Sequence, residues 1–168
     1  MMRSLVILAV AVAATTPAFA AEPSGCDQFK WPIDRERAAL TALARSALVS
    51  GAVVTTPLPV AATLTLKPVA DAGLPFPSER KAAEGTFAGY LSIETARPAG
   101  AYSISLSANA WVDVVQAGRY LKPKAFSGAT DCAGIRKTMR FDLAAAPFVV
   151  QVSRMMENTI ALAILPAE

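Results

Sequence analysis

The second half of the chain alternates between apolar and polar residues with the period of a β-strand. The clearest case is Tyr102, Ile104 and Leu106, which alternate with three serines. Similar short segments recur between turn signals roughly every 8–12 residues, a pattern typical of all-β domains. They predict strands over residues 62–66, 87–93, 102–106, 111–115, 119–121, 139–143, 148–152 and 160–164. No helical segment separates these strands, so we expect an antiparallel β-sandwich rather than a parallel α/β sheet.

One segment before these strands has the spacing of an amphipathic helix instead. Asp34 has the position of an N-cap, Glu36 lies in the first turn, and apolar residues then recur three and four positions apart. We therefore predict one N-terminal α-helix over about residues 35–49, ended by Gly51. The domain boundaries that follow are 21–58 for the helix and its connection and 59–168 for the mainly β sandwich. Within the sandwich, residues 71–84 are expected to form a long exposed loop and residues 122–135 a polar loop.

The first twenty residues have the composition of a signal peptide. Arg3 supplies a positive charge, residues 5–14 are apolar, and Ala18-Phe19-Ala20 is a small–x–small cleavage site. Cleavage between Ala20 and Ala21 would deliver the mature chain to the periplasm or to the outside of the cell. The apolar run is about half the length of a bilayer span, so no transmembrane segment is expected.

The chain has two cysteines, Cys26 and Cys132. An even number of cysteines in an oxidising compartment favours a disulfide bond between them. A redox-active pair would usually have the spacing Cys-x-x-Cys, which is absent. The alternative of a lipid anchor on Cys26 would leave Cys132 unpaired, and the residues before Cys26 lack the leucine of a lipid-attachment motif.

Composition excludes several classes of enzyme. The chain contains no histidine, which removes Ser-His-Asp and Cys-His catalysis and histidine-ligated zinc or iron. No acidic calcium loop, phosphate-binding glycine loop or nucleophile elbow is present. We therefore expect neither a cofactor nor a bound metal. The formal net charge of +3 at pH 7 is weak for 168 residues, so we expect no binding to nucleic acid.

Three segments of the predicted sandwich resemble the pre-peptidase C-terminal (PPC) family of bacterial jelly-roll domains. Residues 100–106 (GAYSISL) are similar to the Gly-x-Tyr-x-aliphatic strand of that family, and residues 111–114 (WVDV) to its central Asp-bearing strand. Residues 141–152 (FDLAAAPFVVQV) are similar to its late strands, although Ala146-Pro147-Phe148 replaces the usual Gly-x-Tyr. The resemblance covers about half of the chain and implies a jelly-roll-like sandwich.

The whole chain is also similar to a group of small exported proteins of proteobacteria, some of which carry the label homogentisate 1,2-dioxygenase. That reaction needs iron held by histidines and a carboxylate. Because the chain has no histidine, its residues disfavour this activity.

Two groups of side chains are candidates for binding a ligand. The aromatic residues Tyr90, Tyr102, Trp111 and Tyr120 could form a platform on which a sugar stacks, although the aromatic residues of a sandwich can equally belong to its core. Tyr102 is in phase with Ile104 and Leu106, so we expect it in the core. Cations gather around Cys132 in the sequence and could form a basic patch for an acidic glycan, a phosphate or a lipid headgroup. They could equally be solvated charges that protect a sheet edge. These cations are Arg119, Lys122, Lys124, Arg136, Lys137 and Arg140.

Three functional hypotheses remain open. The first, which the missing catalytic residue types favour, is an exported non-enzymatic domain that binds an envelope polysaccharide or an exported protein partner. The second is an enzyme that acts on glycans or small aromatics through a lysine or through carboxylates. The third is an accessory subunit that docks through the apolar face of its helix. The candidate carboxylates for the second hypothesis are Glu79, Glu84, Glu94 and Asp113.

Overall fold

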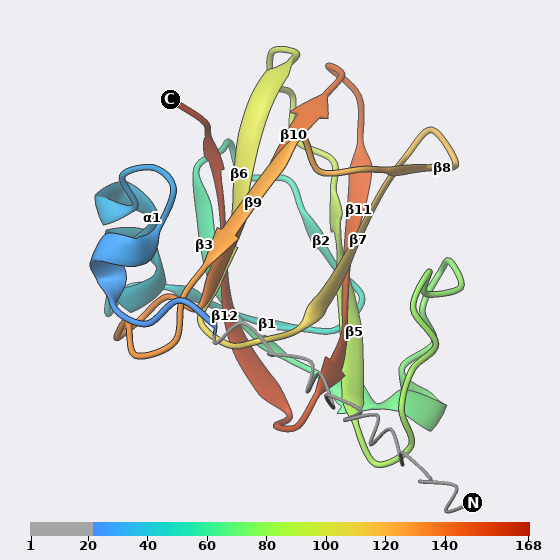
Figure 1. The fold of residues 1–168 in the computed structure, drawn as a ribbon. Helices are drawn as coiled ribbons and strands as arrows, with labels where there is room; N and C mark the ends of the chain where they lie inside the picture. The colour runs from blue at the N-terminus through green and yellow to red at the C-terminus, as the bar shows by residue number, and fades with distance from the viewer. Residues whose placement is uncertain (1–21) are drawn as a thin grey trace, which may run out of the picture.

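Two β-sheets pack face to face, with one α-helix on the outside of the first sheet (Figure 1). The computed structural model describes residues 22–168, so the predicted signal peptide and its cleavage site lie outside the described residues. The order of the first sheet is β1 (Ser46–Val49), β3 (Val60–Thr65), β12 (Thr159–Pro166), β6 (Gly100–Leu106), β10 (Lys137–Leu143) and β9 (Ala125–Gly128).

The second sheet has the order β2 (Ala52–Val54), β5 (Phe87–Ile93), β11 (Phe148–Met155), β7 (Trp111–Gln116) and β8 (Arg119–Leu121), with β4 (Lys67–Pro68) beside β5. Every pairing along β3-β12-β6-β10 and along β5-β11-β7-β8 is antiparallel. Among the strands that the structure describes, the edge strands β1 and β2 alone pair in parallel, with β3 and β5. The prediction of a mainly β sandwich preceded by one helix is confirmed, and its sheets are mixed at these two edges.

The main core lies between the sheets and is built from alternate residues of each strand. Leu64, Ile104, Phe141 and Leu162 of the first sheet are fully buried there, and Val150 faces them from the second sheet. Tyr102 also belongs to this core, as its phase in the sequence predicted, and its hydroxyl donates to the carbonyl oxygen of Pro98 at 2.9 Å. The two-residue periodicity therefore identified the buried face of these strands correctly.

The outer face of the first sheet is covered by the N-terminal part of the chain. Here α1 (Asp34–Thr41) places Leu40 on β12, close to Ala163 and Leu165. A short 3-10 helix, Cys26–Gln28, precedes it, and Cys26 forms the predicted disulfide with Cys132, with an S–S distance of 2.08 Å. The serines that alternate with the core residues within β6 lie under this cover and are buried. Their small side chains allow α1 and its neighbouring residues to pack closely on the sheet.

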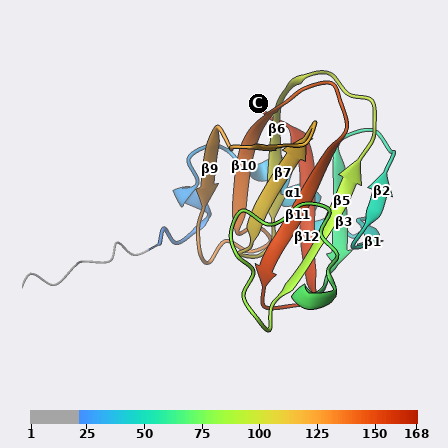
Figure 2. The same ribbon diagram turned by 90° about the vertical axis from the view of Figure 1, so that its right-hand side faces the viewer.

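The outer face of the second sheet is covered by residues 72–85, which follow a second 3-10 helix, Val69–Asp71. This loop lies across the sheet in front of β11 and β7 (Figure 2). Gln151 is buried in β11 and bonds to both the N–H and the carbonyl of Phe76, at 3.0 and 3.1 Å. The segment has no helix or strand and more than half of its residues are exposed, as expected, while polar side chains on the outer face of the sheet hold its backbone.

The expected helix is also too long. The helix ends at Thr41, and Ser46–Val49 instead forms strand β1 on the edge of the first sheet. Leu48 packs against the main core from this strand, so tertiary pairing overrides the local helical spacing. Gly51, at φ 94°, then turns the chain into β2 and so into the second sheet.

Three further strands were missed, of which β2 and β4 have only three and two residues. The expected polar loop 122–135 contains β9, which pairs with β10 at the edge of the first sheet. Within the described residues, no helix has the length and apolar character needed to cross a membrane.

Candidate functional site

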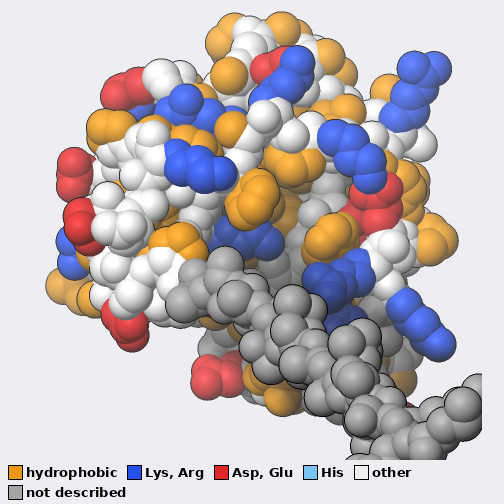
Figure 3. Space-filling model, in the orientation of Figure 1, with side chains coloured by type: hydrophobic (Ala, Val, Ile, Leu, Met, Phe, Trp, Pro, Cys, Tyr) orange, Lys and Arg blue, Asp and Glu red, His pale blue; other side chains and the backbone are white. Residues whose placement is uncertain are grey.

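An apolar groove opens where strands β8 and β9 form the neighbouring edges of the two sheets. Figure 3 shows hydrophobic side chains together with Lys and Arg side chains around this opening. The groove has a volume of about 340 Å³. Its floor includes Met139 of β10 and Val112 of β7, which also pack into the main core. The groove is therefore a solvent-facing extension of the space between the sheets, and it is lined by Glu79, Trp111, Val112, Leu121, Lys122, Pro123, Phe126, Lys137 and Met139.

Phe126 lines the groove from the side of the first sheet. It lies in β9, and 59% of its surface is exposed although it is a large hydrophobic residue. The ammonium group of Lys30 lies 5.0 Å from the centre of its ring. An exposed aromatic ring beside a cation is a feature of many ligand-binding surfaces.

Trp111 lines the groove from the second sheet, and its ring is held in place by two contacts. Its indole N–H donates to Oδ1 of Asp113 at 2.7 Å, and the guanidinium of Arg80 lies 5.6 Å from the ring centre. Asp113 is buried and also accepts a bond from the hydroxyl of Ser78 at 2.8 Å and one from the backbone N–H of Glu79. The carboxylate thus orients Trp111 and anchors the loop 72–85 at the same time.

Lys137 links the two sheets at the mouth of the groove. It lies two residues before Met139 in β10, so the two side chains share a face of the sheet. Its ammonium group donates to the carbonyl oxygen of Ala110 at 2.9 Å. Burial lowers the pKa of Lys137, and the positive charges of Arg136 and Arg80 lower it further. The side chain is therefore a partly desolvated cation without an acidic partner among the described residues.

The structure does not bring all the cations predicted from the sequence into one patch. Lys122 pairs with Glu79 at 2.6 Å on the rim of the groove, and Lys124 pairs with Asp142 at 2.9 Å outside it. Arg136 forms an ion pair with Glu22 and lines a neighbouring hollow together with Lys137. The remaining two lie elsewhere: Arg119 is exposed at the turn between β7 and β8, and Arg140 covers the ring of Trp31 on the outer face of the first sheet.

Tyr120 does not line the groove. Its hydroxyl donates to the carbonyl oxygen of Pro77, and its ring meets that of Phe76 edge to face at 6.4 Å. Desolvation raises the pKa of Tyr120, and the nearby charges of Asp113 and Glu79 raise it further. Its contacts indicate a role in holding the loop 72–85 on the second sheet.

Three side chains at this end of the molecule were not singled out from the sequence. Phe126 was hidden in an expected polar loop, and Arg80 in a segment expected to be exposed. Arg154 comes after the alternating residues of β11. At this point the pairing of β11 with β5 shifts register, between Val152 and Met155. Its backbone has φ 62°, which is uncommon for a residue other than glycine. No local pattern identifies these residues, because only the folded sheets bring their three segments together.

The candidate carboxylates form no catalytic pair. Asp113 is occupied by its hydrogen bonds and Glu79 by Lys122. Glu84 and Glu94 are exposed and do not line the groove. Within residues 22–168, no group of three or more acidic or cysteine side chains lies close enough together to hold a metal ion.

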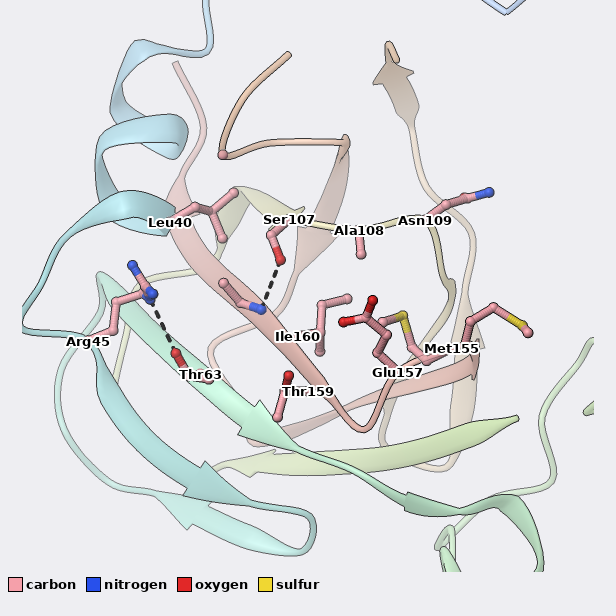
Figure 4. A pocket seen from close by; sticks show the side chains of 13 residues that line it. Leu40, Arg45, Thr63, Ser107, Ala108, Asn109, Met155, Glu157, Thr159 and Ile160 are labelled. Carbon is pink, nitrogen blue, oxygen red and sulfur yellow. Dashed lines mark hydrogen bonds between the residues drawn. The ribbon is translucent and has the colours of Figure 1, made fainter. Parts of the chain in front are cut away.

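A second hollow, of about 600 Å³, lies between α1 and the start of β12 (Figure 4). Arg45 points to Thr63 there and also donates to the carbonyl oxygen of Ala42 at 2.7 Å. The hydroxyl of Ser107 accepts a bond from the backbone N–H of Ala161 at 3.0 Å. Some of the polar groups of this hollow therefore bond to the fold itself, and no aromatic side chain among the described residues lines it.

Comparison of the chain with protein-family models, with curated proteins and with solved structures found no match. The function is therefore inferred from the residues and the geometry of the site.

Proposed function

We propose that this chain is an exported, non-enzymatic domain that binds a glycan of the cell envelope in the groove between β8 and β9. The observation that carries the proposal is the pair of aromatic side chains, Trp111 and exposed Phe126, which line one apolar groove from different sheets. Apolar faces of sugar rings pack on aromatic side chains, and sugar hydroxyls bond to charged groups such as Glu79 and Lys122 on the rim.

The shape of the groove favours a glycan over a protein partner. A protein partner usually buries about 800 Å² on each side of an interface, whereas a groove of about 340 Å³ has the size of a small-ligand site. The apolar face of the helix is also in use, because Leu40 is only 2% exposed against the first sheet. This leaves less apolar helix surface for docking an accessory partner.

Export is part of the proposal and has two supports. The composition of residues 1–20 is that of a signal peptide, and the Cys26–Cys132 disulfide belongs to an oxidising compartment. Intact mass spectrometry of the protein from its native host tests both. We expect a chain that begins at Ala21 and gains two hydrogens on reduction. A retained leader or two free thiols would contradict export.

The order of the strands supports the jelly-roll assignment. The four-strand run β3-β12-β6-β10 faces the run β5-β11-β7-β8, and β5, β6, β7 lie alternately in the second, first and second sheets. Two antiparallel four-strand sheets with such crossings are characteristic of jelly rolls. The strands that resemble the PPC family are β6, β7, β10 and β11 of this arrangement. A relationship to that family is part of the proposal.

Calorimetric titration of the mature protein with envelope oligosaccharides tests the binding function. The probes are soluble peptidoglycan fragments and the core oligosaccharide of lipopolysaccharide. We expect saturable binding by the wild type and about tenfold weaker binding by Phe126→Ala, because the exposed ring supplies apolar contact to the sugar. Leu43→Ala is the matched control, since Leu43 is fully exposed and lies outside the groove.

Three outcomes would contradict the proposal. These are no binding of either probe, equal losses in Phe126→Ala and Leu43→Ala, and recovery of a chemically altered probe after incubation. The last outcome, detected by mass spectrometry of the recovered oligosaccharide, would support the alternative of an enzyme that uses a lysine or carboxylates.

A further inference from the structure

A smaller and more polar hollow, distinct from that of Figure 4, adjoins the groove, and we call it the cationic hollow. It has a volume of about 310 Å³. Trp111 and Lys137 line both spaces, so the two lie side by side. The residues that line the cationic hollow are Arg80, Asn109, Ala110, Trp111, Lys137 and Arg154.

Three cations line this hollow, and no carboxylate does. They come from three separate segments: Arg80 from the loop 72–85, Lys137 from the start of β10 and Arg154 from β11. None of the three forms an ion pair with an acidic residue in the described part of the chain. The carboxylates of the adjoining groove and loop are engaged elsewhere, Asp113 with Trp111 and Glu79 with Lys122.

Each cation also keeps free hydrogen-bond donors. Lys137 uses one of its three N–H groups on the carbonyl oxygen of Ala110. Arg154 donates from Nη1 to the carbonyl oxygen of Lys81 at 2.8 Å, which leaves most of its guanidinium unused. Arg80 rests on the ring of Trp111 with no ion pair to another described side chain. The hollow therefore presents several unpaired donors from three cations.

The hollow contains a strained backbone at Arg154 and positive charges that repel one another. Arg154 has φ 62° at the register shift of β11, and such a bulge turns a side chain out of the regular alternation. The pKa of Lys137 is lowered by its burial and by the charges of Arg136 and Arg80. A bound anion would offset both the mutual repulsion of the cations and the desolvation of Lys137.

We infer that the cationic hollow binds an oxyanion group of the ligand, so that the glycan held in the groove is an acidic one. The inference rests on the proposed function and adds the chemical class of the ligand. A phosphate, sulfate or carboxylate group would accept hydrogen bonds from Arg80, Lys137 and Arg154. The sugar ring that carries it would lie beside Trp111, which borders both spaces.

Titration with matched pairs of acidic and neutral oligosaccharides tests this inference. The pairs are oligogalacturonate with its methyl ester, and phosphorylated lipopolysaccharide core oligosaccharide with its dephosphorylated form. We expect at least one acidic form to bind about tenfold more tightly than its neutral counterpart. Because Arg80→Gln and Arg154→Gln each remove donors from the hollow, we expect both variants to lose that preference. Arg80 also lies against the ring of Trp111 in the groove, so only Arg154→Gln is expected to keep the affinity for the neutral form.

Arg119→Gln is the matched control, because it removes the same charge from an exposed position outside the hollow. We expect it to bind the acidic form as the wild type does. Equal affinity of the wild type for acidic and neutral forms would overturn the inference while leaving the proposed function in place. A loss of affinity in Arg119→Gln as large as that in the two hollow variants would overturn it in the same way. If no member of either pair binds while the peptidoglycan fragments do, the inference alone fails. If the peptidoglycan fragments do not bind either, the proposed function fails and the inference fails with it.

Discussion

Arg97 is a buried arginine that bonds to backbone carbonyl groups. Its guanidinium donates to the carbonyl oxygens of Ala144 and Ala146 at 2.6 and 2.7 Å, and it lies over the rings of Tyr102 and Phe148. These contacts join the start of β6 to the turn between β10 and β11. The charge is stabilised by carbonyl dipoles and aromatic faces rather than by a carboxylate.

We expect Arg97→Ala to lower the free energy of unfolding by about 2–3 kcal/mol, because two carbonyl oxygens lose charged donors and a cavity opens beside the rings. Urea unfolding followed by tryptophan fluorescence measures the change. The exposed Arg119→Ala serves as the control and should alter stability by less than about 0.5 kcal/mol. Equal stabilities of the two variants would show that Arg97 does not anchor the turn.

The lowered pKa of Lys137 predicts how stability depends on pH. Because burial and neighbouring cations lower this pKa in the folded protein from its ordinary value of 10.5, the unfolded chain binds more protons between the lowered pKa and that value. The stability of the wild type relative to Lys137→Met should therefore rise as the pH increases through this window. Urea unfolding of both proteins across alkaline pH measures the difference. A difference that stays constant or falls would contradict the desolvation of Lys137.

At the scale of elements, the loop 72–85 depends on polar anchors from the second sheet. In Gln151→Leu, the N–H and carbonyl of Phe76 would lose their partner on the buried outer face of β11. We expect the loop to open more often and trypsin to cleave more rapidly after Arg80 and Lys81, while the core strands keep their protection.

Tyr120→Phe is a milder comparison, because it removes only the hydroxyl bond to Pro77. We expect its rate of cleavage to lie between those of the wild type and Gln151→Leu. Mass spectrometry of the digestion products identifies the sites. Unchanged cleavage of Gln151→Leu would show that other contacts are sufficient to hold the loop.

The elements that were predicted well are those whose alternation matches their burial. Strands β5, β6, β7, β10, β11 and β12 all begin and end near their expected positions. The helix was extended wrongly because residues 46–49 have small and apolar side chains compatible with both structures, and pairing with β3 decided between them. Strand β9 lacks the alternation of the others, because it is an edge strand whose Phe126 is exposed.

At the scale of the whole molecule, the Cys26–Cys132 disulfide joins residues 106 positions apart. It ties the segment before α1 to the loop that follows β9, where Gly25 and Thr130 also share a backbone hydrogen bond of 2.8 Å. We expect the variant with Cys26→Ala and Cys132→Ala to lose about 3–5 kcal/mol of stability in the chain-entropy description. Guanidinium unfolding at neutral pH measures this.

Ser24→Ala is the matched control for the disulfide variant. It removes a 2.6 Å hydrogen bond to Asp131 at the same place and leaves the covalent link intact. We expect it to change stability by about 1 kcal/mol or less. A similar loss in both proteins would mean that the local hydrogen bonds, and not the cross-link, hold the N-terminal segment.

The sequence by itself determined the sandwich, the pairing of the two cysteines and the exclusion of histidine chemistry. These properties depend on local periodicity and on counts of residue types, which need no knowledge of distant neighbours. Trp111, Lys122 and Lys137 were candidates from the sequence, but only the tertiary structure placed them at one site. Arg80, Lys137 and Arg154 meet only because a loop, a strand start and a bulge from three parts of the chain converge at one end of the sandwich. Such long-range proximity leaves no periodic signal, since it depends on how the two sheets pack and not on the order of residues within either of them.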